Sequence, residues 1–125
     1  MNLSPRSEPF RLSLGRRGEM IAWNELVRRG YKILEKNYRC RLGEIDIVAQ
    51  KKNVLVFIEV KTRRNASFGF PEEAVHQRKK IQLAKLASWY LVRYPKFPQV
   101  RFDVLAIQAE GEQSGIRLIQ NAFEI

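Results

Sequence analysis

Two apolar, β-branched runs in the middle of the chain define the pattern around which the other elements are predicted. Residues 43–49 (GEIDIVA) and 54–61 (VLVFIEVK) are each of strand length, and the four polar residues between them favour a β-hairpin. Charged residues interrupt both runs: Asp46 lies in the first, and Glu59 and Lys61 lie in the second. Because an unpaired buried charge is costly, these residues need an explanation.

The register of the predicted hairpin decides whether the three charged side chains meet. Directly opposed residues of an antiparallel pair point to the same face. Two registers, with Ala49 opposite Val54 or Gln50 opposite Leu55, put all three on one face and leave a four-residue loop. A slip by one residue would move Asp46 to the other face. We predict the converging register.

Two carboxylates beside a lysine form a hard, oxygen-rich pocket. Such a pocket suits Mg²⁺ or Mn²⁺ better than Zn²⁺. The alternative is a structural ion pair between Lys61 and either Glu59 or Asp46, half exposed on the sheet.

The remaining patterns predict one α/β domain. Residues 1–12 lack periodicity and are expected to form a loose arm before a single domain over 13–125. The predicted elements are a helix over 13–29, strands over 31–38, 43–49 and 54–61, a helix over 71–94, and strands over 100–108 and 115–119. The order α-β-β-β-α-β-β predicts a sandwich with a mixed central sheet flanked by helices. Asp103, in the strand over 100–108, is expected to be structural and to pair with Arg101 or a lysine of the second helix.

The first predicted helix carries an acid on its apolar stripe. Glu19 falls in line with Ala22, Trp23 and Leu26 at helical spacing. One interpretation is an edge-of-face acid paired with Arg16 or Trp23. The other is a third carboxylate that the packed helix delivers to the site on the strands.

The second predicted helix has a core stripe at Ile81, Ala84, Ser88 and Leu91. Gln77 precedes Ile81 by four residues. It is therefore expected on the same stripe, near the site if the helix begins beside the second strand of the hairpin.

Composition then narrows the class of partner. The 125 residues include 23 Lys and Arg against 13 Asp and Glu, which gives a net charge of +10 and a pI near 10.2. This balance favours a polyanionic partner, most often nucleic acid, over a ribosomal or anionic membrane contact. The single cysteine, Cys40, excludes an internal disulfide, and a cytoplasmic location fits. No apolar run approaches membrane-spanning length, so no membrane association is expected.

Basic residues gather in three segments: a turn over 39–41, the loop after Lys61, and the early turns of the second helix. Cations at a helix N-terminus oppose its dipole, so phosphate contact is the better explanation for them. The expected nucleic-acid-binding residues are Arg39, Arg41, Arg63, Arg64, Gln77, Arg78, Lys79 and Lys80.

The spacing of Asp46 and Glu59-Val60-Lys61, between an acid-bearing and a basic helix, resembles the PD-(D/E)xK superfamily. This superfamily includes type II restriction enzymes and archaeal Holliday-junction resolvases. The chain is also similar to the YraN family of small bacterial proteins, which are described as uncharacterised or assigned as endonucleases. The similarity runs from about Leu14 to Ile119 and rests on an ordered set of motifs: GE at 18–19, NYR at 37–39, GEIDIVA at 43–49, FIEVKTR at 57–63, FG at 68–69 and RFDV at 101–104.

The resemblance implies a restriction-endonuclease-like fold and a role for each matching residue. Asp46 and Glu59 would be Mg²⁺ ligands together with the Val60 carbonyl, and Lys61 would orient the attacking water and steady the developing charge. Glu19 matches the helix-one acid of the resolvase-like members, and Gln77 matches a polar residue on their following helix. Ile45 stands where the superfamily name expects a proline. Resolvase-like enzymes act as dimers, which extends the analogy to a homodimer.

Three functions follow, in this order. The first is a Mg²⁺-dependent or Mn²⁺-dependent endonuclease that hydrolyses phosphodiester bonds in DNA, favoured over RNA, with branched or junction DNA as a candidate substrate. The second is a non-catalytic nucleic-acid-binding module that keeps the nuclease fold. The third is a basic scaffold bound to the ribosome or to a protein, including a homodimer through an exposed strand or the first helix.

Overall fold

The computed structural model describes residues 14–63, 77–108 and 115–122. Its elements are α1 (Leu14–Arg28), β1 (Lys32–Cys40), β2 (Gly43–Lys51), β3 (Val54–Arg63), α2 (Gln77–Arg93), β4 (Gln99–Gln108) and β5 (Gly115–Ile119). The predicted order α-β-β-β-α-β-β is therefore confirmed. The predicted arm over 1–12 and the predicted helix start at residue 71 lie outside the described residues. Neither described helix is long and apolar enough to span a membrane.

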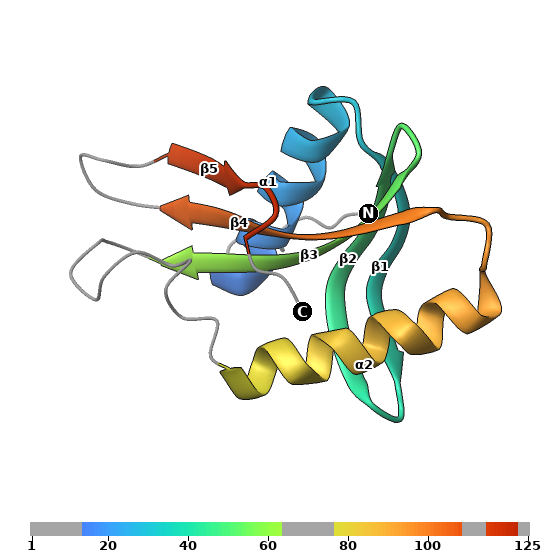
Figure 1. Ribbon diagram of the computed structural model, residues 1–125. Coiled ribbons are helices and arrows are strands. Elements are labelled where there is room, and N and C mark those ends of the chain that lie inside the picture. The colour runs from blue at the N-terminus through green and yellow to red at the C-terminus, as the bar shows by residue number, and fades with distance from the viewer. Residues whose placement is uncertain (1–13, 64–76, 109–114, 123–125) are drawn as a thin grey trace, which may run out of the picture.

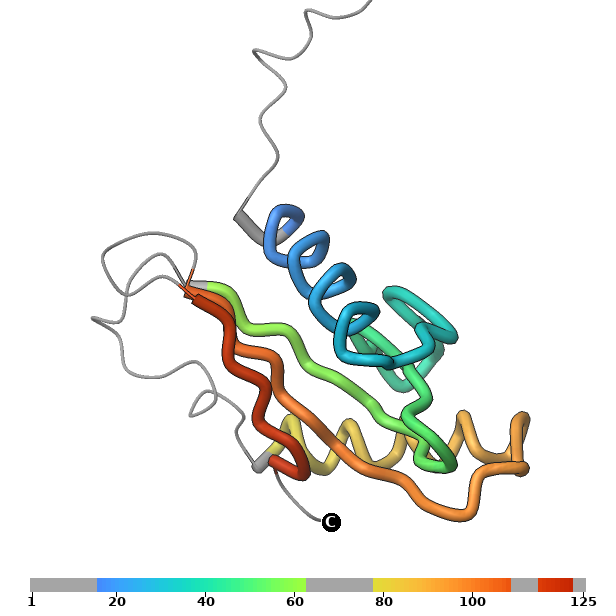
Figure 2. Tube along the Cα trace, turned by 90° about the horizontal axis from the view of Figure 1, so that it is seen from above, coloured from blue at the N-terminus to red at the C-terminus, as the bar shows by residue number. Residues whose placement is uncertain are grey.

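The five strands form one mixed sheet in the order β1-β2-β3-β4-β5. β3 and β4 are parallel, and the other neighbouring pairs are antiparallel. The helix α2 connects the two parallel strands and covers one face of the sheet, while α1 covers the other (Figures 1 and 2). The α/β sandwich expected for a restriction-endonuclease-like fold is thus present.

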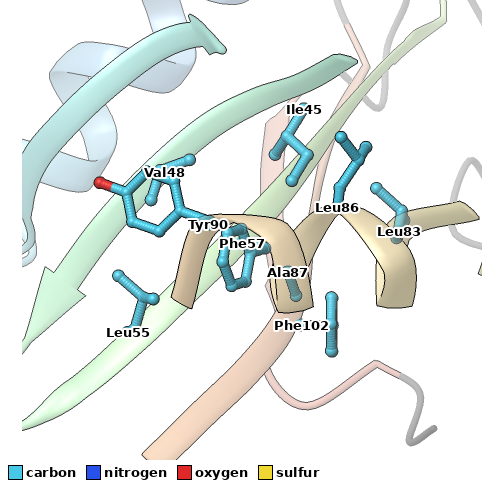
Figure 3. Close-up of a cluster of buried hydrophobic side chains, with 9 residues drawn as sticks. All are labelled: Ile45, Val48, Leu55, Phe57, Leu83, Leu86, Ala87, Tyr90 and Phe102. Carbon is cyan, nitrogen blue, oxygen red and sulfur yellow. The ribbon is translucent and has the colours of Figure 1, made fainter. Parts of the chain in front are cut away.

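The α2 face of the sheet is packed by a different helix stripe from the predicted one. Leu83, Leu86, Ala87 and Tyr90 are the buried α2 residues, and Figure 3 shows them against the sheet. The predicted stripe is wrong, because Ile81 is 49% exposed and Ser88 is also exposed. Two apolar stripes overlap on this helix, and the one that carries Tyr90 lies against the sheet.

Aromatic packing accounts for this choice of stripe. The Tyr90 ring makes edge contacts with Tyr38 of β1, at 5.2 Å between ring centroids, and with Phe57 of β3, at 5.7 Å. Phe57 in turn stacks on Phe102 of β4 at 5.6 Å. Edge-to-face and offset stacks at these distances are favourable beyond the area they bury.

On the opposite face, α1 buries Ala22 and Leu26 completely against the sheet. The expectation that Trp23 shares this stripe is wrong, since 38% of Trp23 remains exposed. Gly18 takes its place, because Gly18, Ala22 and Leu26 recur every four residues. A Cβ at Gly18 would lie 2.2 Å from Oγ1 of Thr62, so the helix approaches the end of β3 more closely than any side chain would allow.

The end of α1 follows the predicted glycine stop. Gly30 has φ of 91°, and its N–H donates to the Val27 carbonyl at 3.0 Å. The N–H of Tyr31 donates to the Leu26 carbonyl at 2.9 Å. These two bonds satisfy carbonyls at the helix end and form a Schellman motif.

The central hairpin adopts one of the two converging registers. Gln50 pairs with Leu55, which confirms that Asp46 and Glu59 share a face. The loop is shorter than predicted, because Lys51 also pairs with Val54 and only two residues form the turn. The strand before the hairpin also ends later than predicted. β1 extends through Cys40, so Arg39 belongs to a strand and not to a turn.

Asp103 is structural, as the sequence predicts. It is 1% exposed, and its carboxylate accepts hydrogen bonds from the Arg101 guanidinium at 2.9 and 3.0 Å. The Tyr31 hydroxyl and the Asn121 N–H also donate to it, at 3.2 and 2.9 Å. This bonding with Asp103 raises the pKa of Arg101, and burial raises the pKa of Tyr31.

The close contact of α1 with β3 gives a first prediction. Gly18→Ala should lower the free energy of unfolding by about 1–3 kcal/mol, because overpacking outweighs the gain of about 1 kcal/mol in helix propensity. Denaturant unfolding of the single variants and of the Gly18→Ala, Thr62→Ala double variant measures this. The alanine should cost less in the Thr62→Ala background, and equal costs in both backgrounds would contradict the contact.

Candidate functional site

The candidate site lies where β2 and β3 separate. Their pairing runs from the hairpin turn to Ile47 opposite Ile58, and Asp46 is the next residue of β2. There Oδ2 of Asp46 accepts a hydrogen bond of 2.8 Å from the backbone N–H of Val60. Beyond this point β2 turns toward α2 while β3 continues beside β4 (Figure 1). The Asp46 carboxylate therefore accepts a backbone hydrogen bond where the β2–β3 pairing ends.

Alternation along β3 fixes the direction of the other two charged residues. Leu55 and Phe57 belong to the core under α2, whereas Val56 and Ile58 belong to the core under α1. Glu59 and Lys61 continue the first series and so face α2. The predicted convergence of the three charged residues therefore holds.

Glu59 is 8% exposed and has two lysines as neighbours. Nζ of Lys61 lies 3.4 Å from its Oε2, and Nζ of Lys79, on α2, lies 3.8 Å from the same oxygen. The structural ion pair considered from sequence is therefore real for Glu59. Among the described residues Asp46 has no such partner within 4.0 Å, so an ion pair alone does not account for both acids.

Asp46 is held in an environment that disfavours its charge. Burial raises the pKa of this carboxyl from 3.8 to about 6, and the negative charge of Glu59 acts in the same direction, as does that of Glu44. The Val60 N–H and the positive charge of Lys79 only partly oppose the increase. In this site the effects that disfavour the charge of Asp46 outweigh those that favour it. A divalent cation would stabilise two close carboxylates in such surroundings.

The position of Lys79 was not anticipated from the sequence, which predicts phosphate contact for it. Its place follows from the observed stripe of α2, since Lys79 precedes buried Leu83 by four residues. The spacing of Lys79, Leu83 and Tyr90 was the signal that could have identified it. Gln77 was expected at this place, but its side chain lies outside the described residues.

The Val60 carbonyl is oriented consistently with a role at the same site. In an extended strand the N–H and C=O of one residue point to the same side. The Val60 N–H points to Asp46, so we infer that its carbonyl is directed to that side as well.

The donor set fits Mg²⁺ or Mn²⁺ with two protein carboxylates. Within residues 14–63, 77–108 and 115–122, no group of three or more His, Cys, Asp or Glu side chains is placed to hold a metal. Glu19 belongs to the helix on the opposite face, next to Gly18, and does not complete such a group with Asp46 and Glu59. Mg²⁺ keeps several waters and is commonly held by one or two carboxylates plus substrate phosphates, so two carboxylates could hold it here.

The other predicted phosphate-binding residues are distributed unevenly. Arg41 and Arg78 are exposed, and Lys80 is half-buried. Nε of Arg39 lies 3.3 Å from Oε2 of Glu44, an ion pair on the exposed side of β1 and β2. Arg64 and the side chain of Arg63 lie outside the described residues.

Comparison with known proteins establishes the family. Residues 18–107 match the uncharacterised protein family UPF0102. The chain belongs to the UPF0102 family. This finding confirms the similarity to YraN proteins, and the matched segment contains Asp46, Glu59, Lys61 and Lys79.

Bacterial members of the UPF0102 family are similar over nearly their whole length. The UPF0102 protein of Syntrophotalea carbinolica is 47% identical over 116 residues, which cover 92% of this chain and 94% of the relative. The UPF0102 protein of Syntrophomonas wolfei is 50% identical over 111 residues, or 88% of this chain and 96% of the relative. Their names state a family and no activity.

The pKa of Asp46 gives a second prediction. Below about pH 4 the carboxyl is protonated in both folded and unfolded chains, and above about pH 6 it is ionised in both, at a cost to the folded state. An increase from 3.8 to about 6 corresponds to about 3 kcal/mol, so this contribution destabilises the metal-free protein as the pH rises through that window.

Asp46→Asn should remove this cost while its side-chain oxygen still accepts the Val60 N–H. We expect the variant to be about 1–3 kcal/mol more stable than wild type at about pH 8 in a chelator, with little difference at about pH 4. Denaturant unfolding at both pH values measures it. A variant that is less stable than wild type by the same amount at both values would show that the charge of Asp46 is not destabilising.

Proposed function

We propose that this UPF0102 protein is a Mg²⁺-dependent or Mn²⁺-dependent endonuclease that hydrolyses phosphodiester bonds in DNA. The observation that carries the proposal is the pair of half-buried Asp46 and buried Glu59: lysines from β3 and α2 lie beside Glu59, and the pKa of Asp46 is raised. Acids of this kind clustered with cations are typical of functional sites.

Each residue of the site has a separate role in the proposed reaction. Asp46 and Glu59 would hold the divalent cation, with the Val60 carbonyl as a further oxygen donor. When bound, such a cation supplies positive charge to a phosphoryl oxygen and makes a water more acidic. Lys61, 25% exposed and next to Glu59, orients the attacking water and stabilises charge that develops on the phosphate.

Several parts of the proposal concern the substrate and the assembly. A net charge of +10 supports binding to a polyanion, and exposed Arg41 and Arg78 are candidates for backbone contacts. Branched DNA, a homodimer and a supporting role for Gln77 rest on the resemblance to resolvase-like nucleases, whereas Glu19, on the helix that covers the opposite face of the sheet, is given no role at this site. A cytoplasmic location accords with a DNA substrate in bacteria.

A second candidate is a nucleic-acid-binding module without catalysis. The observation in its favour is that two lysines already partly neutralise the charge of Glu59. A protein that binds no metal would need this neutralisation. The two candidates differ in metal dependence, because binding to phosphates alone requires no divalent cation and weakens steeply with salt.

The third prediction separates these candidates. Labelled four-way junction, flap, nicked duplex, plain duplex, single-stranded DNA and RNA are incubated with Mg²⁺ or Mn²⁺. We expect metal-dependent cleavage of DNA, reduced about 100-fold or more by Asp46→Asn and by Lys61→Ala. Lys52→Ala, at the exposed hairpin turn, is the matched control and should retain wild-type rates.

Cleavage that persists in Asp46→Asn would overturn the assignment of the site. Absence of product from every substrate, with salt-sensitive DNA binding retained, would favour the binding module. Thermal unfolding of each variant shows whether a loss of cleavage reflects a loss of fold.

A further inference from the structure

We propose that Lys79 is an internal counter-ion of the candidate site. In the metal-free protein its ammonium group supplies positive charge to the two carboxylates, as the metal would. When a divalent cation is present, Lys79 binds the substrate phosphate instead. This inference rests on the proposed function. It assigns to one α2 lysine a role distinct from general contact with the DNA backbone.

The contacts of Glu59 provide the first argument. Its Oε2 has two ammonium groups near it, Lys61 at 3.4 Å and Lys79 at 3.8 Å. The charge of Lys79 also acts on Asp46, so this lysine interacts with both acids of the pair. A divalent cation held by the same two carboxylates would repel Lys79 at close range.

The contacts of Gln82 hold the backbone of α2, and with it the backbone of Lys79, beside the site. Gln82, three residues later on α2, donates from Nε2 to the Leu42 carbonyl at 2.9 Å. Gly43 follows with φ of 135°, and a Cβ there would lie 2.4 Å from Nε2 of Gln82. The helix is thus held against the start of β2, the strand that carries Asp46.

The two lysines differ in how they reach Glu59. Lys61 is two residues from Glu59 on the same strand, so it stays beside that acid. Lys79 reaches the acid from another element, and its side chain is 34% exposed. A long, flexible side chain at this boundary can turn from the carboxylates to a phosphate that approaches from solvent.

A purely structural ion pair would behave differently from a counter-ion. Removal of a structural partner weakens the fold and leaves metal affinity unchanged or lower. Removal of a counter-ion also weakens the metal-free fold, because two acids lose a neutralising charge, but it makes metal binding tighter. The two roles therefore predict different changes in metal affinity: unchanged or weaker binding for a structural partner, and tighter binding for a counter-ion.

The test compares Lys79→Met with Lys85→Met, a matched loss of charge at an exposed position of the same helix. Thermal unfolding in a chelator and Mn²⁺ binding by paramagnetic resonance are measured at about pH 8, where Asp46 is ionised. We expect Lys79→Met to unfold at a lower temperature without metal but to bind Mn²⁺ about tenfold more tightly than wild type. Lys85→Met should match wild type in both.

Cleavage provides an independent readout. Lys79→Met should reach half-maximal activity at a lower metal concentration than wild type, with a maximal rate reduced about 100-fold. Lys79→Gln, which keeps a hydrogen-bond donor without the charge, should behave in the same way and guards against a packing defect of the methionine.

Mn²⁺ affinity that is unchanged or weaker in both Lys79 variants overturns the inference, as does a wild-type protein that binds no Mn²⁺. If wild type binds Mn²⁺ but cleaves no substrate, the proposed endonuclease function fails. Tighter Mn²⁺ binding by the Lys79 variants would then still support the counter-ion role.

Discussion

The central constraint in this structure is that two acids are held close together where a pair of strands separates. Asp46 and Glu59 extend from neighbouring strands toward the same layer, and burial together with the negative charge of Glu59 raises the pKa of Asp46. Only a backbone N–H and nearby lysines oppose this repulsion in the described residues. The folded state therefore contains a site that is destabilising once Asp46 is ionised, and sites of this kind are common where function requires them.

The rest of the fold holds this pair in place from both sides. On one face, the close contact of Gly18 with Thr62 sets α1 directly on the end of β3 that follows the site. On the other, the aromatic contacts of Tyr90 and the bond from Gln82 to Leu42 fix α2 along its length. The Asp103 network joins β4 to the start of β1 and to the chain after β5, and is fully satisfied and structural. The contrast between the two acids is informative, because Asp103 accepts four hydrogen bonds, whereas within the described residues Asp46 accepts one, from the Val60 N–H.

Family membership and site chemistry contribute different information. The UPF0102 match shows what the chain is related to, and the relatives at 47% and 50% identity align with 92% and 88% of it. Neither states a reaction. The proposed reaction rests on the carboxylate pair and its lysines, since fold and family alone do not determine function. The net charge of +10 is a separate reason to expect a polyanionic partner.

The sequence by itself determined the order of elements, the converging register of the hairpin and the meeting of Asp46, Glu59 and Lys61. These features follow from local periodicity and from strand alternation, which are written in consecutive residues. Only the tertiary structure decided which stripe of each helix is buried. On α2 two overlapping apolar stripes were available, and aromatic packing against the sheet selected the one that brings Lys79 to the site. On α1 the contact of Gly18 with Thr62 selected the stripe that leaves Trp23 exposed. A pattern of apolar residues does not reveal such a glycine contact. The phase of a helix against a sheet is set by non-local contacts, and for that reason it could not be obtained from the chain alone.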